Sequence, residues 1–186
     1  MVLAAVASLM GIVVMLAWEY DWPVLRSFGM GRVTMKPATA TAFILAGAMI
    51  MLTHIPNHRQ WRPSVISGCA FSVAGLMLMT MYVHGDIFGL EGDAPVFTSS
   101  PGRPSVFTIM CFLGLAIWGI AHVCDIRRAV IVPWLVALVG IVAMIGYAMD
   151  WPLLYSYIDG ASTAMAVHTA FGFVLLGVSA GVRRLP

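Results

Sequence analysis

Residues 17–29 read AWEYDWPVLRSFG and residues 148–160 read AMDWPLLYSYIDG. Both segments place the tripeptide Asp-Trp-Pro directly after a long apolar run, at Asp21-Trp22-Pro23 and at Asp150-Trp151-Pro152. A related tripeptide, Asp86-Ile87-Phe88, follows a third apolar run between them. The aspartates are 65 and 64 residues apart. This even spacing indicates an internal repeat, in which each aspartate ends a helix and the bulky residue after it anchors the chain at a membrane interface.

A second marker opens the apolar run that follows each of these three segments. In each case a threonine is followed four residues later by a phenylalanine, in the pairs Thr39 and Phe43, Thr108 and Phe112, and Thr169 and Phe173. Residues four apart share one face of a helix. We interpret the pairs as packing residues between helices, with ligand binding as the alternative. The two markers together predict three copies of one helical hairpin, at approximately residues 1–62, 63–127 and 128–186.

The composition places these hairpins in a membrane. Hydrophobic residues make up 61% of the 186 residues and charged residues only 10%, whereas a soluble domain carries about 25% charged residues. About 20 apolar residues are enough to cross a bilayer core roughly 30 Å thick. We therefore predict an all-α integral membrane protein, a single domain of six transmembrane helices. The predicted spans are residues 2–18, 38–54, 64–83, 105–124, 129–149 and 164–182.

The distribution of charge predicts the orientation of these spans. Basic residues dominate the connections after the second and fourth spans and the C-terminus, whereas seven of the eight acidic residues lie in the three longer connections. Lys and Arg near helix ends favour the cytoplasm. Both termini are therefore expected in the cytoplasm, although Arg26, Arg32 and Lys36 in the first long connection oppose this orientation.

Several classes of function are not indicated. The net charge of +2 and the absence of a long basic run give no sign of a nucleic-acid partner. Cys69, Cys111 and Cys124 lack the spacing of a metal site. The sequence contains no nucleophile elbow, no paired carboxylates within a span, no HExxH motif and no glycine-rich phosphate loop, and its acidic residues lie in connections or at helix ends rather than within spans. We therefore predict no catalytic residues and no metal site, and expect that the chain is not an enzyme.

Two histidines remain as candidates for cofactor binding. His168 lies near the start of the sixth span, and an ionisable residue within the membrane suggests a function. Its imidazole could ligate a haem or the magnesium of a chlorin, with His84 as the partner; the alternative is a hydrogen-bonded packing histidine. Met77, Met81 and His84 share one helical face, which would suit Cu(I), but methionines are also common flexible fillers of apolar cores.

The segments GRVTMKPATATAFILAG (residues 31–47) and GASTAMAVHTAFGFVLLG (residues 160–177) resemble a known family. The chain is similar to the six-helix N-terminal membrane region of bacterial sensor histidine kinases and diguanylate cyclases. This resemblance implies a location in the bacterial inner membrane and a role in sensing at the membrane. Members of the family continue into a cytoplasmic output domain, whereas this sequence ends with GVRRLP shortly after the sixth span.

Two functions are therefore expected. The first is a non-catalytic accessory subunit that packs within a larger membrane complex of respiratory or photosynthetic type, with the lipid bilayer and other membrane subunits as its partners. The second is the sensory input module that the resemblance implies, without its output domain. The end of the chain at the membrane surface favours the accessory subunit.

Overall fold

The computed structural model describes residues 1–27, 33–55, 60–83, 103–155 and 164–182, and within these ranges all regular structure is helical. Each of the six predicted windows contains a helix whose ends lie within three residues of the prediction. The long helices are α1 (Val2–Glu19), α3 (Pro37–Thr53), α4 (Arg62–Tyr82), α5 (Val106–Val123), α6 (Ile131–Ala148) and α7 (Val167–Gly181). Shorter helices are α2 (Pro23–Ser27), η1 (Arg127–Val130) and η2 (Pro152–Leu154).

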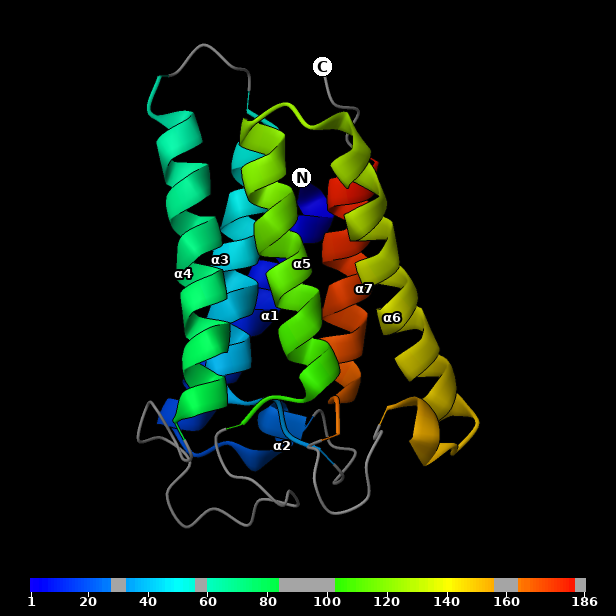
Figure 1. Ribbon diagram of the computed structural model, residues 1–186. Coiled ribbons are helices and arrows are strands. Elements are labelled where there is room, and N and C mark those ends of the chain that lie inside the picture. Colours follow the sequence, from blue (N-terminus) through cyan, green and yellow to red (C-terminus); the bar gives the residue numbers. More distant parts are fainter. Residues whose placement is uncertain (28–32, 56–59, 84–102, 156–163, 183–186) are drawn as a thin grey trace.

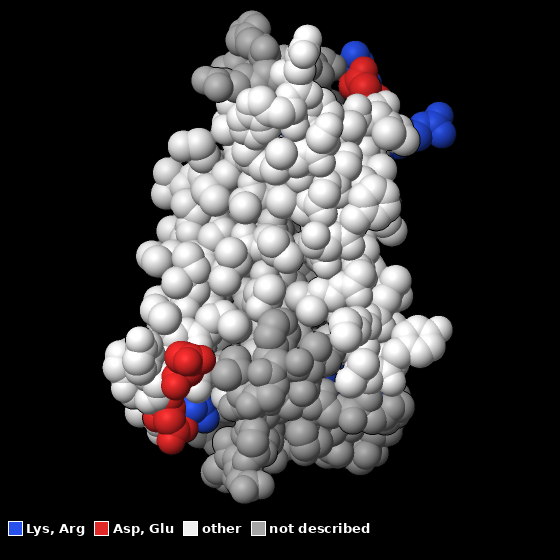
Figure 2. Space-filling view, turned by 90° about the vertical axis from the view of Figure 1, so that its left-hand side faces the viewer, with Lys and Arg blue, Asp and Glu red and all other residues white. Residues whose placement is uncertain are grey.

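Four of the helices are long and apolar enough to cross a membrane. They are α1, α4, α5 and the continuous helix formed by η1 and α6, each with at least 18 residues. Helices α3 and α7 are also apolar but shorter, with 17 and 15 residues. Figure 2 shows that the charged side chains on the displayed face lie near its two ends, with a wide uncharged surface between them. Length, composition and this surface identify a membrane protein.

Consecutive long helices pack against each other as antiparallel neighbours (Figure 1). The most extensive contacts join α1 to α3, α4 to α5, and α6 to α7, and further contacts join α3 to α4, α5 to α6, and α1 to α7. Helices α3, α5 and α7 supply the centre of the core, whereas α4 and α6 lie at the sides of the bundle. Helix α1 begins at the end of the bundle where α7 ends.

Glycines allow α6 and α7 to approach closely. A Cβ atom on Gly140 of α6 would lie 2.5 Å from the carbonyl oxygen of Ala170. A Cβ atom on Gly177 of α7 would lie 2.5 Å from the carbonyl oxygen of Pro133. Both distances are shorter than a van der Waals contact, so only glycine fits at either position. Such small residues permit the backbone contacts that stabilise helix pairs in membranes.

Aspartates in a left-handed conformation end three of the helices. Asp21, Asp125 and Asp150 have φ angles of 54°, 56° and 51° and follow α1, α5 and α6. In each case the next residue donates its backbone N–H to a carbonyl five residues earlier: Trp22 to Ala17 at 2.9 Å, Ile126 to Ala121 at 2.9 Å, and Trp151 to Gly146 at 2.8 Å. These bonds are those of the Schellman motif, which satisfies carbonyls at a helix end.

The prolines of the two Asp-Trp-Pro segments each begin a short helix. Helices α1 and α6 end at Glu19 and Ala148, before either proline is reached. Pro23 and Pro152 are the first residues of α2 and η2, where a missing backbone N–H costs least. The aspartate therefore ends the long helix and the proline starts the short one. Asp86 lies outside the described residues.

Candidate functional site

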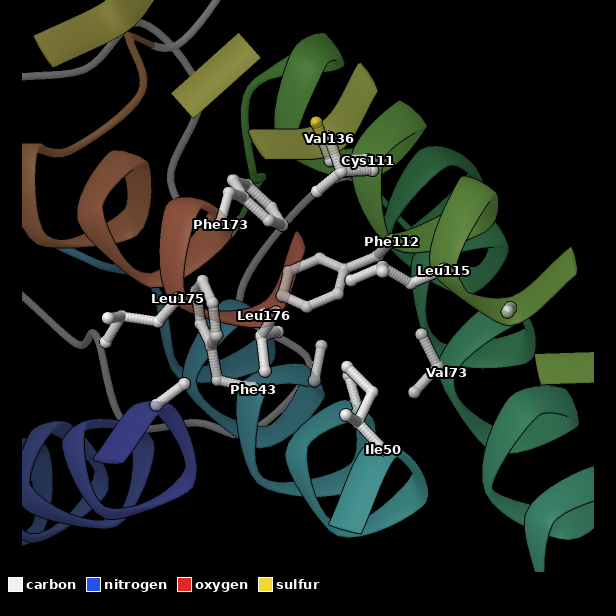
Figure 3. Close-up of a cluster of buried hydrophobic side chains, with 14 of the residues drawn as sticks. Phe43, Ile50, Val73, Cys111, Phe112, Leu115, Val136, Phe173, Leu175 and Leu176 are labelled. Carbon is white, nitrogen blue, oxygen red and sulfur yellow. The ribbon is translucent and has the colours of Figure 1, made fainter. Parts of the chain in front are cut away.

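Three phenylalanine rings meet at the centre of the bundle. Phe43 of α3, Phe112 of α5 and Phe173 of α7 are fully buried and point toward one another (Figure 3). Their ring centroids are 4.9 Å, 4.9 Å and 5.2 Å apart, in edge-to-face and tilted arrangements. These separations are those at which aromatic pairs attract each other. The rings, which we call the phenylalanine cluster, fill the core at this level.

The three threonines lie one turn closer to the helix N-termini. Thr39, Thr108 and Thr169 are each the third residue of their helix, and all three line one pocket of about 10 Å³. Lys36 and Arg103 also line this threonine pocket. A pocket of this size holds about one water molecule. The pairs of threonine and phenylalanine seen in the sequence thus form two layers, one polar and one aromatic.

Among the described residues, the groups at the threonine pocket contribute positive charge. The N-termini of α3, α5 and α7 surround it, and each helix N-terminus carries a partial positive charge. Lys36 is 3% exposed and adds a cationic side chain. Ser105 caps α5 by accepting a hydrogen bond from the Thr108 backbone N–H at 3.2 Å, and the two hydroxyl oxygens are 2.8 Å apart. The pocket is suited to a water molecule or a small electronegative atom.

The structure places His168 beside the threonine pocket but not among the residues that line it. His168 is the second residue of α7 and is 4% exposed. His84, its expected partner in a cofactor site, lies outside the described residues. Met77 is fully buried in the core, whereas Met81 is exposed on α4. In the described ranges no three His, Cys, Asp or Glu side chains are grouped so that they could hold a metal ion.

A methionine is held in the same way before α3 and before α7. The Trp18 indole N–H donates to the Met35 carbonyl oxygen at 2.8 Å, and the Met35 backbone N–H donates to the Arg26 carbonyl oxygen at 3.0 Å. Correspondingly, the Tyr147 hydroxyl donates to the Met165 carbonyl oxygen at 2.6 Å, and the Met165 backbone N–H donates to the Tyr155 carbonyl oxygen at 2.9 Å. We call these arrangements the two methionine clasps.

The side chains of each clasp also stack. The guanidinium of Arg26 lies over the Trp18 ring at 4.2 Å from its centroid, and Arg26 donates a hydrogen bond of 2.5 Å to Asp21. The rings of Tyr147 and Tyr155 stack with centroids 4.0 Å apart. In both clasps one member lies three residues before the aspartate and the other five residues after it. Sequence reasoning missed these residues, although this shared offset was visible.

A buried arginine closes the opposite end of the bundle. The Arg62 guanidinium donates to the carbonyl oxygens of Leu52, at 2.8 Å from Nε, and Thr53, at 3.0 Å from Nη2. These carbonyls belong to the last turn of α3, where the helical hydrogen-bond pattern ends, and Leu52 also accepts a hydrogen bond from the Ile55 backbone N–H at 3.2 Å. Arg62 also lies 3.5 Å from the imidazole of His122, which stacks on Trp118. Arg62 therefore joins the start of α4 to the end of α3.

Replacing Arg62 by methionine should lower the free energy of unfolding by about 2 kcal/mol, because the buried Thr53 carbonyl and the half-buried Leu52 carbonyl lose a charged donor. Methionine keeps an unbranched apolar stem, so the loss reports the hydrogen bonds rather than the packing. Unfolding of the purified protein in mixed micelles with increasing sodium dodecyl sulfate would measure it. Arg128→Met, at an exposed position, is the matched control. Equal stability of the two variants would contradict this role of Arg62.

The chain matches no protein-family model, no curated protein and no solved structure. Its function must therefore be inferred from its own residues. Four features of the described residues bear on function: the phenylalanine cluster, the threonine pocket, the two methionine clasps and the outer surface of the bundle.

Proposed function

We propose that the chain is a membrane module of six transmembrane helices, built from three hairpins at approximately residues 1–62, 63–127 and 128–186. The two methionine clasps support this repeat, since Trp18 and Arg26 correspond to Tyr147 and Tyr155 in position and in contacts. The phenylalanine cluster supports it as well, because each hairpin contributes one ring from the same turn of its second helix.

In this proposal α3 and α7 also cross the bilayer. At 1.5 Å per residue their 17 and 15 residues extend about 25 Å and 22 Å, somewhat less than a core of roughly 30 Å. A membrane adapts to short spans by local thinning at modest cost. Helices α3 and α7 lie among longer neighbours, and the short extended segments at residues 33–36 and 164–166 precede them. The membrane is the bacterial inner membrane, with both termini in the cytoplasm.

We infer that the module is non-catalytic and serves as an accessory subunit that packs within a larger membrane complex. The observation that carries this proposal is the contrast between a filled centre and an uneven outer surface. The phenylalanine cluster occupies the centre. A cavity of about 190 Å³ instead opens on the side of the bundle between α5 and α6, where the Leu138 side chain is 53% exposed. Such a bundle is suited to contacts within the plane of the membrane.

A sensory input module is the second candidate function. The threonine pocket favours it, because three helix N-termini, Lys36 and Arg103 meet at the end of the bundle toward the longer connections. A small electronegative group bound there would contact all three proposed hairpins at once. Binding could then change how the hairpins pack, which is what a membrane sensor requires.

Extraction of the native membrane in a mild detergent distinguishes the two functions. An accessory subunit should migrate with a large complex and be present in a fixed ratio to its other subunits. Size-exclusion chromatography followed by quantitative mass spectrometry of the peak measures both properties. Migration as a free monomer or a symmetric dimer would contradict the accessory subunit and leave the sensory module as the better proposal.

A further inference from the structure

A groove runs along the outer surface between α4 and α5. Its floor consists of alanines, and two large side chains stand beside them: Phe71 of α4 is 69% exposed and Ile117 of α5 is 64% exposed. The cavity measures about 320 Å³ and its lining is almost entirely apolar. The alanines are Ala70, Ala74, Ala116 and Ala121. We call this the α4/α5 groove.

The α4/α5 groove covers only half the thickness of a membrane. On α5 it extends from Leu113, near the middle of the helix, to Ala121 in its last turn, and it continues to Ile126 just beyond the helix. The ten helical steps from Leu113 to the end of α5 at Val123 rise about 15 Å. Half of a bilayer core is also about 15 Å. The groove therefore matches the depth of one leaflet.

Two exposed arginines follow the residue at the end of this groove. Arg127 and Arg128 come directly after Ile126, and the exposed Asp125 comes directly before it. Arg62 is at the same end of α4, but it is buried and bonded to the carbonyls of α3. Among the residues that the structure describes, the exposed groups next to the groove thus carry one negative and two positive charges. This excess of positive charge lies where a lipid headgroup in that leaflet would be.

We propose that the α4/α5 groove binds an anionic phospholipid, with an acyl chain against the alanine floor and the phosphate near Arg127 and Arg128. The arginines are suited to this contact because a guanidinium binds phosphate with two parallel hydrogen bonds. The proposal depends only on the location of the chain in a membrane and not on its role as an accessory subunit.

The dimensions of the groove favour a lipid over a partner helix. A transmembrane partner would contact the bundle across both leaflets, whereas this cavity ends near the middle of α5. Beyond that point α4 continues to Tyr82 with exposed, bulky side chains such as Met79 and Tyr82, which leave no comparable floor of small residues. A single acyl chain needs only the half-length that the groove provides.

Native mass spectrometry of the purified chain in detergent tests this proposal. Phosphatidylglycerol and phosphatidylcholine with identical acyl chains are added in turn, and the retained lipid is counted as the collision energy rises. We expect phosphatidylglycerol to bind about tenfold more tightly than phosphatidylcholine. The double variant Arg127→Gln/Arg128→Gln should remove this preference. Equal retention of the two lipids by the unmodified chain would overturn the proposal.

Two matched controls separate the groove from general effects of charge and size. Arg183→Gln/Arg184→Gln removes the same charge at the C-terminus and should keep the preference. Ala74→Leu fills the groove and should weaken retention of both lipids, whereas Ala5→Leu at an exposed position of α1 should not. Equal losses within either pair would contradict the site.

A photoreactive residue at position 117 that crosslinks to a polypeptide instead of lipid in native membranes would assign the groove to a partner helix.

These experiments measure lipid binding by the isolated chain, or crosslinks formed by the chain in native membranes. They therefore do not depend on copurification with a complex. Loss of the lipid preference with intact copurification would disprove the lipid site alone. A retained preference in a chain that migrates as a monomer would disprove the accessory subunit alone.

Discussion

Replacing Gly140 by leucine is expected to separate α6 from α7 and to lower the free energy of unfolding by about 3 kcal/mol or more. A Cβ atom at this position would lie 2.5 Å from the Ala170 carbonyl oxygen and 3.1 Å from the Val174 backbone nitrogen. Backbone atoms cannot rotate away as a flexible side chain can. The two helices must therefore move apart and lose contacts along their length, which costs more than the roughly 1–3 kcal/mol of ordinary overpacking.

Gly75→Leu is the matched control for this substitution. Gly75 is also within a helix, on α4, but nothing lies within 4 Å of a Cβ atom placed on it. The change in side chain is the same, so a difference in stability between the two variants reports the contact of α6 with α7. Unfolding in mixed micelles, with helix content followed by circular dichroism, measures it. Similar stabilities for both variants would show that α6 and α7 are not in close contact.

Truncation of the phenylalanine cluster should give the second largest effect. Phe43→Ala, Phe112→Ala and Phe173→Ala should each destabilise the protein by about 2–4 kcal/mol, because each leaves a buried cavity beside two other rings. The lower part of this range applies if the unfolded helices remain in lipid, where the ring keeps apolar surroundings. The same unfolding measurement applies to the three variants.

Phe71→Ala provides the control for these truncations. Phe71 is 69% exposed on α4, so the same atoms are removed without leaving a buried cavity, and we expect a loss below about 1 kcal/mol. The three core variants should also resemble one another, since the rings are equally buried and similarly spaced. A large loss at one ring and none at the other two would argue against equivalent positions in three hairpins.

The positions of the helices could be predicted from the sequence because apolar runs in a membrane protein are long and are separated by polar connections. The pairs of threonine and phenylalanine were also visible, because a spacing of four residues defines a helical face. That the three pairs meet at the centre of the bundle could not be predicted, since the sequence does not show which faces of α3, α5 and α7 pack together. Burial of Thr39, Thr108 and Thr169 around one pocket required the three-dimensional arrangement.

Other features could not be predicted from the sequence because they depend on backbone conformation or on contacts between distant segments. Asp125 ends α5 in the left-handed conformation without any Asp-Trp-Pro sequence, so the tripeptide was too narrow a marker for this type of helix end. Arg62 belongs to the basic connection after the second predicted span, and the sequence does not show that it is buried, with the carbonyls of Leu52 and Thr53 accepting its hydrogen bonds. The α4/α5 groove depends on the packing of two helices and has no sequence signature.

The two methionine clasps have a consequence for the history of the chain. The Arg26/Trp18 and Tyr155/Tyr147 pairs differ in charge and ring type, yet in both an aromatic side chain donates to a methionine carbonyl oxygen at the equivalent position. If the hairpins descend from one ancestral hairpin, the main-chain hydrogen bonds were retained while charge and ring type diverged. In that case the common origin of the hairpins would be preserved in the geometry of their helix ends rather than in the chemistry of their side chains.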